Sequence, residues 1–88
     1  MTQRKHSGIE ERNELVHEFA PVGRYRVRLL RDKDDGELYL DVREYLAGGK
    51  FEGFTRRGVR LVDVKEIEAL QSDLIFVIDR WKKEEESR

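Results

Sequence analysis

The chain has no cysteine, a single proline and no long hydrophobic run. The absence of cysteine excludes a disulfide framework, a thiolate metal site and a cysteine nucleophile. Because a secreted domain of this size usually needs disulfides, we expect a cytoplasmic or nucleoid-associated protein, or a nuclear one in a eukaryote. No stretch approaches the ~20 apolar residues of a transmembrane span, and the N-terminus lacks the apolar run of a signal peptide. We therefore expect no membrane partner.

The 88 residues are enough for one domain and too few for two. With 38% hydrophobic and 42% charged residues the core must be thin, so self-association is an expected supplement. We divide the chain into a flexible N-terminal tail over residues 1–18 and one folded domain over residues 19–85. An alternative for the tail is a short helix through Val16, since Ser7-Gly8-Ile9-Glu10 has the form of a capping box.

Charge is unevenly distributed along the chain, although the net charge is only −1. Residues 21–61 contain 10 basic and 7 acidic residues, whereas residues 62–88 contain 5 basic and 8 acidic ones. The first of these segments is therefore net positive and the second net negative. Such asymmetry indicates a binding face for an anionic partner better than the overall charge does.

Alternating apolar and polar residues predict strands in the positive segment. Asp35-Gly36 suits a tight turn between the first two strands, and Gly48-Gly49 suits the next turn. A further turn is expected at Thr55–Gly58. Short consecutive connections favour an antiparallel meander. The four predicted strands are Arg24–Leu30, Leu38–Leu46, Lys50–Phe54 and Val59–Val62.

Strand alternation gives the sheet one polar and one apolar face. The polar face carries Arg24, Arg26 and Arg28 on the first strand and Tyr39, Asp41, Arg43 and Tyr45 on the second. The apolar face carries Tyr25, Val27, Leu29, Leu38, Leu40 and Val42. Two interpretations of the arginines stay open: a row of phosphate contacts, or a solvated face neutralised by acidic neighbours such as Asp41. The tyrosines fit ligand stacking and cross-strand packing equally well.

A helix is predicted from Asp63 to about Glu85, because Asp63 and Glu66 have the spacing of a capping box and no Gly or Pro interrupts. A 3- and 4-residue spacing gives a stripe that we expect to face the sheet: Val64, Ile67, Leu70, Leu74, Val77 and Trp81. Leu74–Ile78 is apolar in every direction around the helix axis, so we infer a homodimer. The predicted interface residues are Leu74, Ile75, Phe76, Ile78 and Trp81. The competing interpretation makes Leu74–Ile78 a fifth strand.

Two motifs resemble the positive cofactor four family of transcriptional coactivators. The first is the strand Leu40-Asp41-Val42-Arg43-Glu44-Tyr45, and the second is Arg56-Arg57-Gly58-Val59-Arg60-Leu61. Their order, with a hairpin before and a capped helix after, makes the resemblance specific. It runs from about Phe19 to Lys83.

The resemblance implies an α+β fold in which a four-stranded antiparallel curved sheet precedes one long C-terminal helix, with two copies paired through their helices. It also implies binding of single-stranded DNA by the basic sheet, with contacts at Arg31, Arg43, Arg56 and Arg57. We thus expect a homodimeric single-stranded DNA-binding or RNA-binding protein of transcription regulation, replication or repair, with transcription or repair proteins as further partners. The predicted nucleic-acid-binding residues are Arg24, Arg26, Arg28, Arg31, Lys33, Tyr39, Arg43, Tyr45, Phe54, Arg56, Arg57 and Arg60.

The alternative function is a dimeric protein-interaction module of the same fold with little nucleic-acid affinity. Asp35 and Glu37 flank the hairpin glycine where the family often has lysines, and Leu46 follows Tyr45 where it often has a stacking aromatic. We expect no enzyme, catalytic residue, metal or cofactor. Asp41 and Glu44 lie on opposite faces of one strand and cannot form a catalytic pair.

Overall fold

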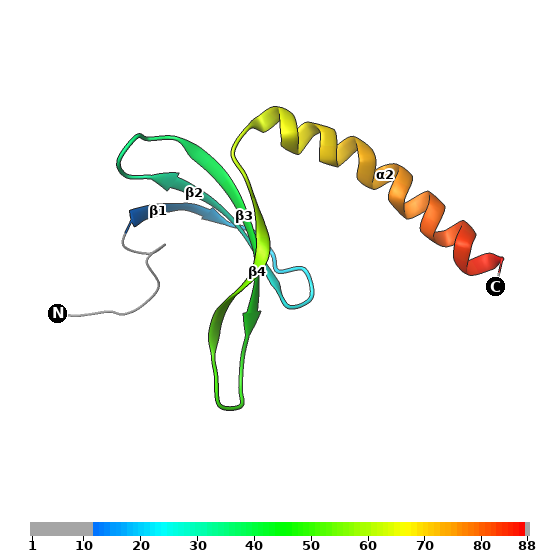
Figure 1. Ribbon diagram of the computed structural model, residues 1–88, viewed down its shortest axis with the longest axis horizontal. Helices are drawn as coiled ribbons and strands as arrows, with labels where there is room; N and C mark the ends of the chain where they lie inside the picture. Colours follow the sequence, from blue (N-terminus) through cyan, green and yellow to red (C-terminus); the bar gives the residue numbers. More distant parts are fainter. Residues whose placement is uncertain (1–11, 88) are drawn as a thin grey trace.

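The computed structural model describes residues 12–87, which form a four-stranded antiparallel sheet followed by one long helix (Figure 1). The strands pair in chain order, so the sheet is a meander. The predicted α+β class, antiparallel meander and C-terminal helix are confirmed. The elements are β1 (Asn13–Glu18), β2 (Tyr25–Asp32), β3 (Leu38–Leu46), β4 (Gly53–Leu61) and α2 (Val64–Glu86).

Strand β1 occupies part of the segment that we predicted to be a tail. It pairs with β2 through a register that places Glu14 opposite Arg31 and Glu18 opposite Arg28, with an irregularity between Leu15 and His17. The acidic residues of β1 thus meet the arginines of β2, and Glu18 Oε2 lies 3.4 Å from Arg26 Nη1. The predicted capping box at residues 7–10 lies outside the described residues.

Strand β4 is continuous where we predicted two short strands and a turn at Thr55–Gly58. Its register with β3 passes from Arg43–Gly58 to Tyr45–Phe54, so three residues of β4 lie opposite Glu44 alone. The turn-like residues therefore form a bulge within one strand. Gly58 lets β4 approach β3 closely, because a Cβ at this position would clash with the Val42 carbonyl oxygen and lie 2.9 Å from Arg43 Cα.

Helix α2 begins where the sequence predicts. The Asp63 side chain accepts a hydrogen bond from the Lys65 backbone N–H at 2.9 Å, and Glu66 Oε1 accepts one from the Val62 N–H at 3.3 Å. The first bond satisfies a backbone donor that the first helical turn leaves free, and the second ties the residue before the cap to that turn. The alternative fifth strand at Leu74–Ile78 is wrong, because this segment is helical.

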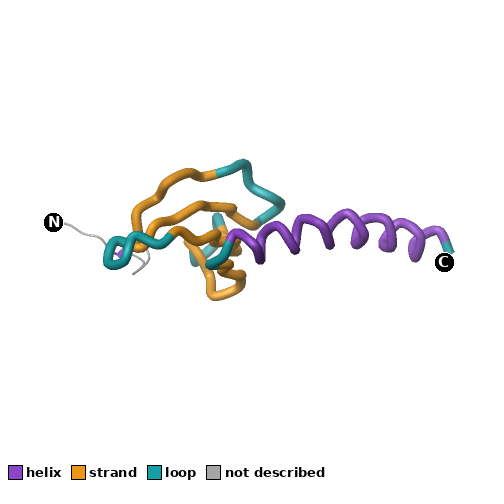
Figure 2. Tube along the Cα trace, turned by 90° about the horizontal axis from the view of Figure 1, so that it is seen from above, coloured by secondary structure: helices purple, strands orange, loops and turns teal. Residues whose placement is uncertain are grey.

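The helix does not pack on the sheet as we predicted. It projects away from the end of β4 (Figures 1 and 2), and none of its residues is buried. The stripe expected to face the sheet is open, with Leu74 46% and Trp81 65% exposed. The Cα radius of gyration is 16.2 Å, against about 12 Å for a compact chain of this length. Periodicity showed that this helix needs a partner surface but not which surface.

Within residues 12–87, no helix has the length and hydropathy that crossing a membrane requires.

The deepest burial is on the polar face of the sheet. Leu30 and Tyr39 are 2% and 6% exposed. Arg28 and Asp41, paired across β2 and β3, are 3% and 0% exposed. Residues of the opposite, apolar face are only half-buried or exposed, which leaves a hydrophobic surface beside an uncovered helix: Tyr25, Val27, Leu29, Leu38, Leu40, Val42, Val59 and Leu61.

Candidate nucleic-acid interface

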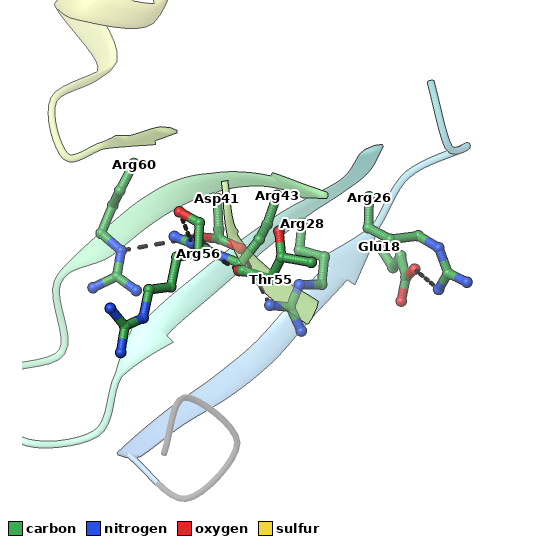
Figure 3. Close-up of polar contacts among 8 residues, drawn as sticks. All are labelled: Glu18, Arg26, Arg28, Asp41, Arg43, Thr55, Arg56 and Arg60. Carbon is green, nitrogen blue, oxygen red and sulfur yellow. Dashed lines mark hydrogen bonds and ion pairs between the residues drawn. The ribbon is translucent and has the colours of Figure 1, made fainter. Parts of the chain in front are cut away.

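Arginines from three neighbouring strands converge on one face of the sheet (Figure 3). The register sets Arg28 opposite Asp41 and Asp41 opposite Arg60, and it sets Arg26 opposite Arg43. Directly opposed residues project to the same side of a sheet. We call this surface, defined by Arg26, Arg28, Arg43 and Arg60, the arginine face.

Asp41 lies at the centre of the arginine face and is fully buried. Its Oδ2 accepts a hydrogen bond from Arg28 Nη2 at 3.2 Å, and its Oδ1 accepts from Arg43 Nη2 at 3.0 Å and Nε at 3.3 Å. Arg60 Nε lies 4.0 Å from the same Oδ1. A single carboxylate thus lies within 4.0 Å of three guanidinium groups. Such charge-assisted pairs orient planar guanidinium groups.

Arg43 also holds the bulge of β4 in place. Its Nη1 donates to the carbonyl oxygens of Arg56 at 3.2 Å and Thr55 at 3.4 Å. All three guanidinium nitrogens therefore have partners in the protein, and only 16% of the side chain is exposed. Arg43 shapes the face more than it offers donors to a ligand.

Arg43→Ala should therefore reduce stability, by about 2 kcal/mol, because the buried Asp41 carboxylate and two backbone carbonyl oxygens lose a charged donor. Arg57→Ala is the matched control: its side chain is 80% exposed, so the change should stay within about 0.5 kcal/mol. Urea unfolding followed by circular dichroism measures both. Equal stability of the two variants would show that the Arg43 contacts do not stabilise the fold.

Each of three arginines on this face lies over an aromatic ring. The guanidinium carbon of Arg26 is 4.1 Å from the Tyr45 ring centroid, that of Arg28 is 4.0 Å from Phe54, and that of Arg60 is 4.3 Å from Tyr39. The Tyr45 and Phe54 rings meet edge to face at 5.0 Å. These are cation–π contacts. The rings that we predicted as stacking surfaces for bases are thus packed against arginines.

Both tyrosines stay neutral near physiological pH. Burial raises the pKa of Tyr39 above its ordinary value, although the nearby Arg60 cation opposes the shift. Desolvation, together with the hydrogen bond that the Tyr45 hydroxyl donates to Glu52 Oε2 at 3.2 Å, raises the pKa of Tyr45. Neither phenol therefore adds a negative charge to the face.

A second carboxylate, Glu44, lies on the face of β3 opposite Asp41 and contacts another pair of basic residues. It is 4% exposed and accepts a hydrogen bond from Thr55 Oγ1 at 2.9 Å. Arg24 Nη1 lies 3.3 Å from its Oε2, and Arg57 Nε lies 4.0 Å from its Oε1. Arg24 and Arg57 remain largely exposed, at 65% and 80%. They are available to an anion.

The remaining predicted contacts divide by location. Arg56 is exposed and extends to the same side as Arg28 and Arg60 (Figure 3). Arg31 lies at the far end of β2, where its Nη1 donates to the Gly36 carbonyl oxygen at 3.3 Å. Lys33 is exposed in the first hairpin. The structure therefore brings most of the predicted set together and leaves Arg31 and Lys33 at an acidic turn.

Sequence reasoning missed the organising role of the two buried carboxylates. Asp41 entered only as a neutralising neighbour, and Glu44 only as one half of a rejected catalytic pair. The available signal was an acidic residue at an alternate strand position among arginines. Among residues 12–87, no group of His, Cys, Asp or Glu is arranged to hold a metal ion.

Comparison of the chain with protein-family models, with curated proteins and with solved structures found no match.

Proposed function

We propose that this protein is a homodimeric single-stranded nucleic-acid-binding protein that acts in transcription regulation, replication or repair. The observation that carries the proposal is the arginine face, where guanidinium groups from three strands surround one buried carboxylate. Exposed Arg56 extends this charge along the bulge of β4, while Arg57 lies beside Glu44. A positive surface with planar side chains suits the phosphates and base faces of a single strand.

Single strands suit this surface better than duplex does. Proteins that read the major groove commonly insert a helix with basic residues. The only long helix described here, α2, is apolar in its middle and acidic near its end. The curved sheet instead offers charge and guanidinium planes over a broad face, as proteins that bind single strands do.

The homodimer rests on the uncovered hydrophobic surfaces. Phe76 is 72% exposed and Ile75 65% exposed on α2, while no element within residues 12–87 covers the apolar face of the sheet. Large exposed apolar surfaces mark association sites in soluble proteins. A second copy of the chain offers an equal and complementary surface, as two-fold dimers do.

Fluorescence anisotropy with a labelled oligo-dT and its duplex counterpart, at several salt concentrations, tests the proposal. We expect tighter binding of the single strand, with log affinity falling by about 0.7 per log unit of salt for each phosphate contacted. The Arg56→Ala/Arg57→Ala variant should bind more weakly, with a slope shallower by about 1.4. Lys82→Ala/Lys83→Ala removes the same charge from the helix and should bind as the wild type does.

Failure of the wild type to bind oligo-dT at low salt would contradict the proposal. It would favour the second candidate, a dimeric protein-interaction module. That candidate is favoured by the acidic first hairpin, where Asp34 and Asp35 follow Lys33, and by Leu46, which stands where a stacking aromatic was expected.

A further inference from the structure

Two half-exposed guanidinium groups on the arginine face differ from their neighbours. The side chains of Arg26 and Arg60 are 36% and 41% exposed, whereas those of Arg28 and Arg43 are 4% and 16% exposed. The guanidinium carbons of Arg26 and Arg60 lie 4.1 and 4.3 Å from the centroids of the Tyr45 and Tyr39 rings. Each side chain thus contacts a ring and keeps part of its surface open to solvent.

We propose that Arg26 and Arg60 are the base-stacking platforms of this surface, each binding the face of an unpaired nucleobase on its open side. This inference rests on the proposed function and names the ligand group that the arginines contact. A guanidinium plane stacks on aromatic bases as it stacks on tyrosine, and base stacking of this kind tolerates any sequence. The tyrosines then support the arginines from beneath and do not touch the ligand.

The protein holds both platforms in place before a ligand arrives. Arg60 Nε faces Asp41 Oδ1 at 4.0 Å, and Arg26 Nη1 lies 3.4 Å from Glu18 Oε2. Each guanidinium is thus fixed by a ring on one side and a carboxylate at its edge. Less rotamer freedom is lost on binding when a side chain is already positioned.

The spacing of the platforms determines which bases they can reach. Arg60 and Arg26 lie on strands that flank β3 and are offset by two residues along the sheet. Standard strand geometry puts their Cα atoms about 12 Å apart. This is about three and a half times the 3.4 Å rise per nucleotide of a stacked strand. The two bound bases are therefore expected not to be adjacent.

The test distinguishes the contribution of each arginine's positive charge to binding from the contribution of its planar guanidinium group. Arg60→Lys and Arg26→Lys keep the charge and remove the plane, and each is titrated with oligo-dT and with an abasic strand of equal length and charge. We expect the wild type to bind oligo-dT about tenfold more tightly than the abasic strand. Each lysine variant should lose most of this ratio while binding the abasic strand within about twofold of the wild type.

Arg80→Lys is the matched control, since Arg80 is an exposed arginine on α2, outside the arginine face; it should keep the wild-type ratio. Far-ultraviolet circular dichroism verifies that each variant is folded, and the two lysine variants test the inference independently. Two outcomes with a wild type that binds would refute the inference: both lysine variants keep the wild-type ratio, or both lose affinity equally for the two strands. Arg26 and Arg60 would then act as charges only, and the proposed function would stand without this inference. If the wild type binds neither strand, the proposed function fails and the inference fails with it.

Discussion

Asp41→Asn is expected to weaken binding of single-stranded oligonucleotides, although it removes a negative charge from a surface that binds anions. Asp41 is fully buried and bonded to Arg28, whose side chain is 4% exposed. Without the carboxylate, Arg28 loses this buried ion pair, and Arg43 and Arg60 lose the group that orients them. Removing one member of a buried ion pair destabilises a protein by about 3–5 kcal/mol. We expect a loss of that order in urea unfolding and at least a tenfold loss in oligo-dT affinity.

Asp34→Asn provides the control for charge. Asp34 is exposed in the first hairpin, so its replacement alters the net charge equally without touching the arginine face. Its stability should change by no more than about 0.5 kcal/mol, and its affinity should stay level or rise slightly. Should Asp41→Asn bind as tightly as Asp34→Asn, the arginines need no orientation and only their charge counts.

The second largest expected effect is that Phe76→Asp weakens association of the proposed dimer. Phe76 is 72% exposed on α2, so in a single chain an aspartate there is an ordinary surface residue. In a dimer paired through this helix, the same aspartate would be a buried charge without a partner, which costs several kcal/mol. We therefore expect the dimer to dissociate, with a rise of at least a hundredfold in its dissociation constant. Light scattering after size-exclusion chromatography measures this directly.

Gln71→Asp adds the same charge to the same helix outside the apolar run and should leave the dimer intact. A wild type that is monomeric at tens of micromolar would refute the dimer. A Phe76→Asp variant with an unchanged dimer would instead move the interface to the apolar face of the sheet.

Local chemistry made several elements predictable. The bounds of β3 match the alternating run Leu38–Leu46. Gly36, with φ of 76°, and Gly48, with φ of 82°, occupy the left-handed turn positions that the dipeptides Asp35-Gly36 and Gly48-Gly49 predict. The start of α2 follows from the side chain of Asp63. In each case residues within a few positions determine the conformation.

The missed features depend on contacts between distant residues. The alternation of β1 is broken between Leu15 and His17, and its acidic residues meet arginines that lie 8 to 17 residues further along the chain. The bulge in β4 is stabilised by Arg43, which lies on another strand. Neither interaction leaves a periodic pattern in its own segment.

The candidate site also has features that the sequence predicts and features that it does not. Alternation correctly predicts that arginines share one face, because this is a property of any strand. It does not predict that Arg28 is buried while Arg60 stays half-exposed. That difference follows the strand order, because Arg28 lies on β2 between two strands whereas Arg60 lies on the edge strand β4.

The junction between β4 and α2 has a consequence for avidity. The main contact of the helix with the sheet is at β4, and its length extends away from the sheet (Figures 1 and 2). In the proposed dimer the helices would carry the association and leave each sheet as a separately tethered module. A strand long enough to reach both sheets would meet the second at a high effective concentration set by the helices. Affinity should then increase in a step once the oligonucleotide spans both modules, and this step should disappear in a monomeric variant.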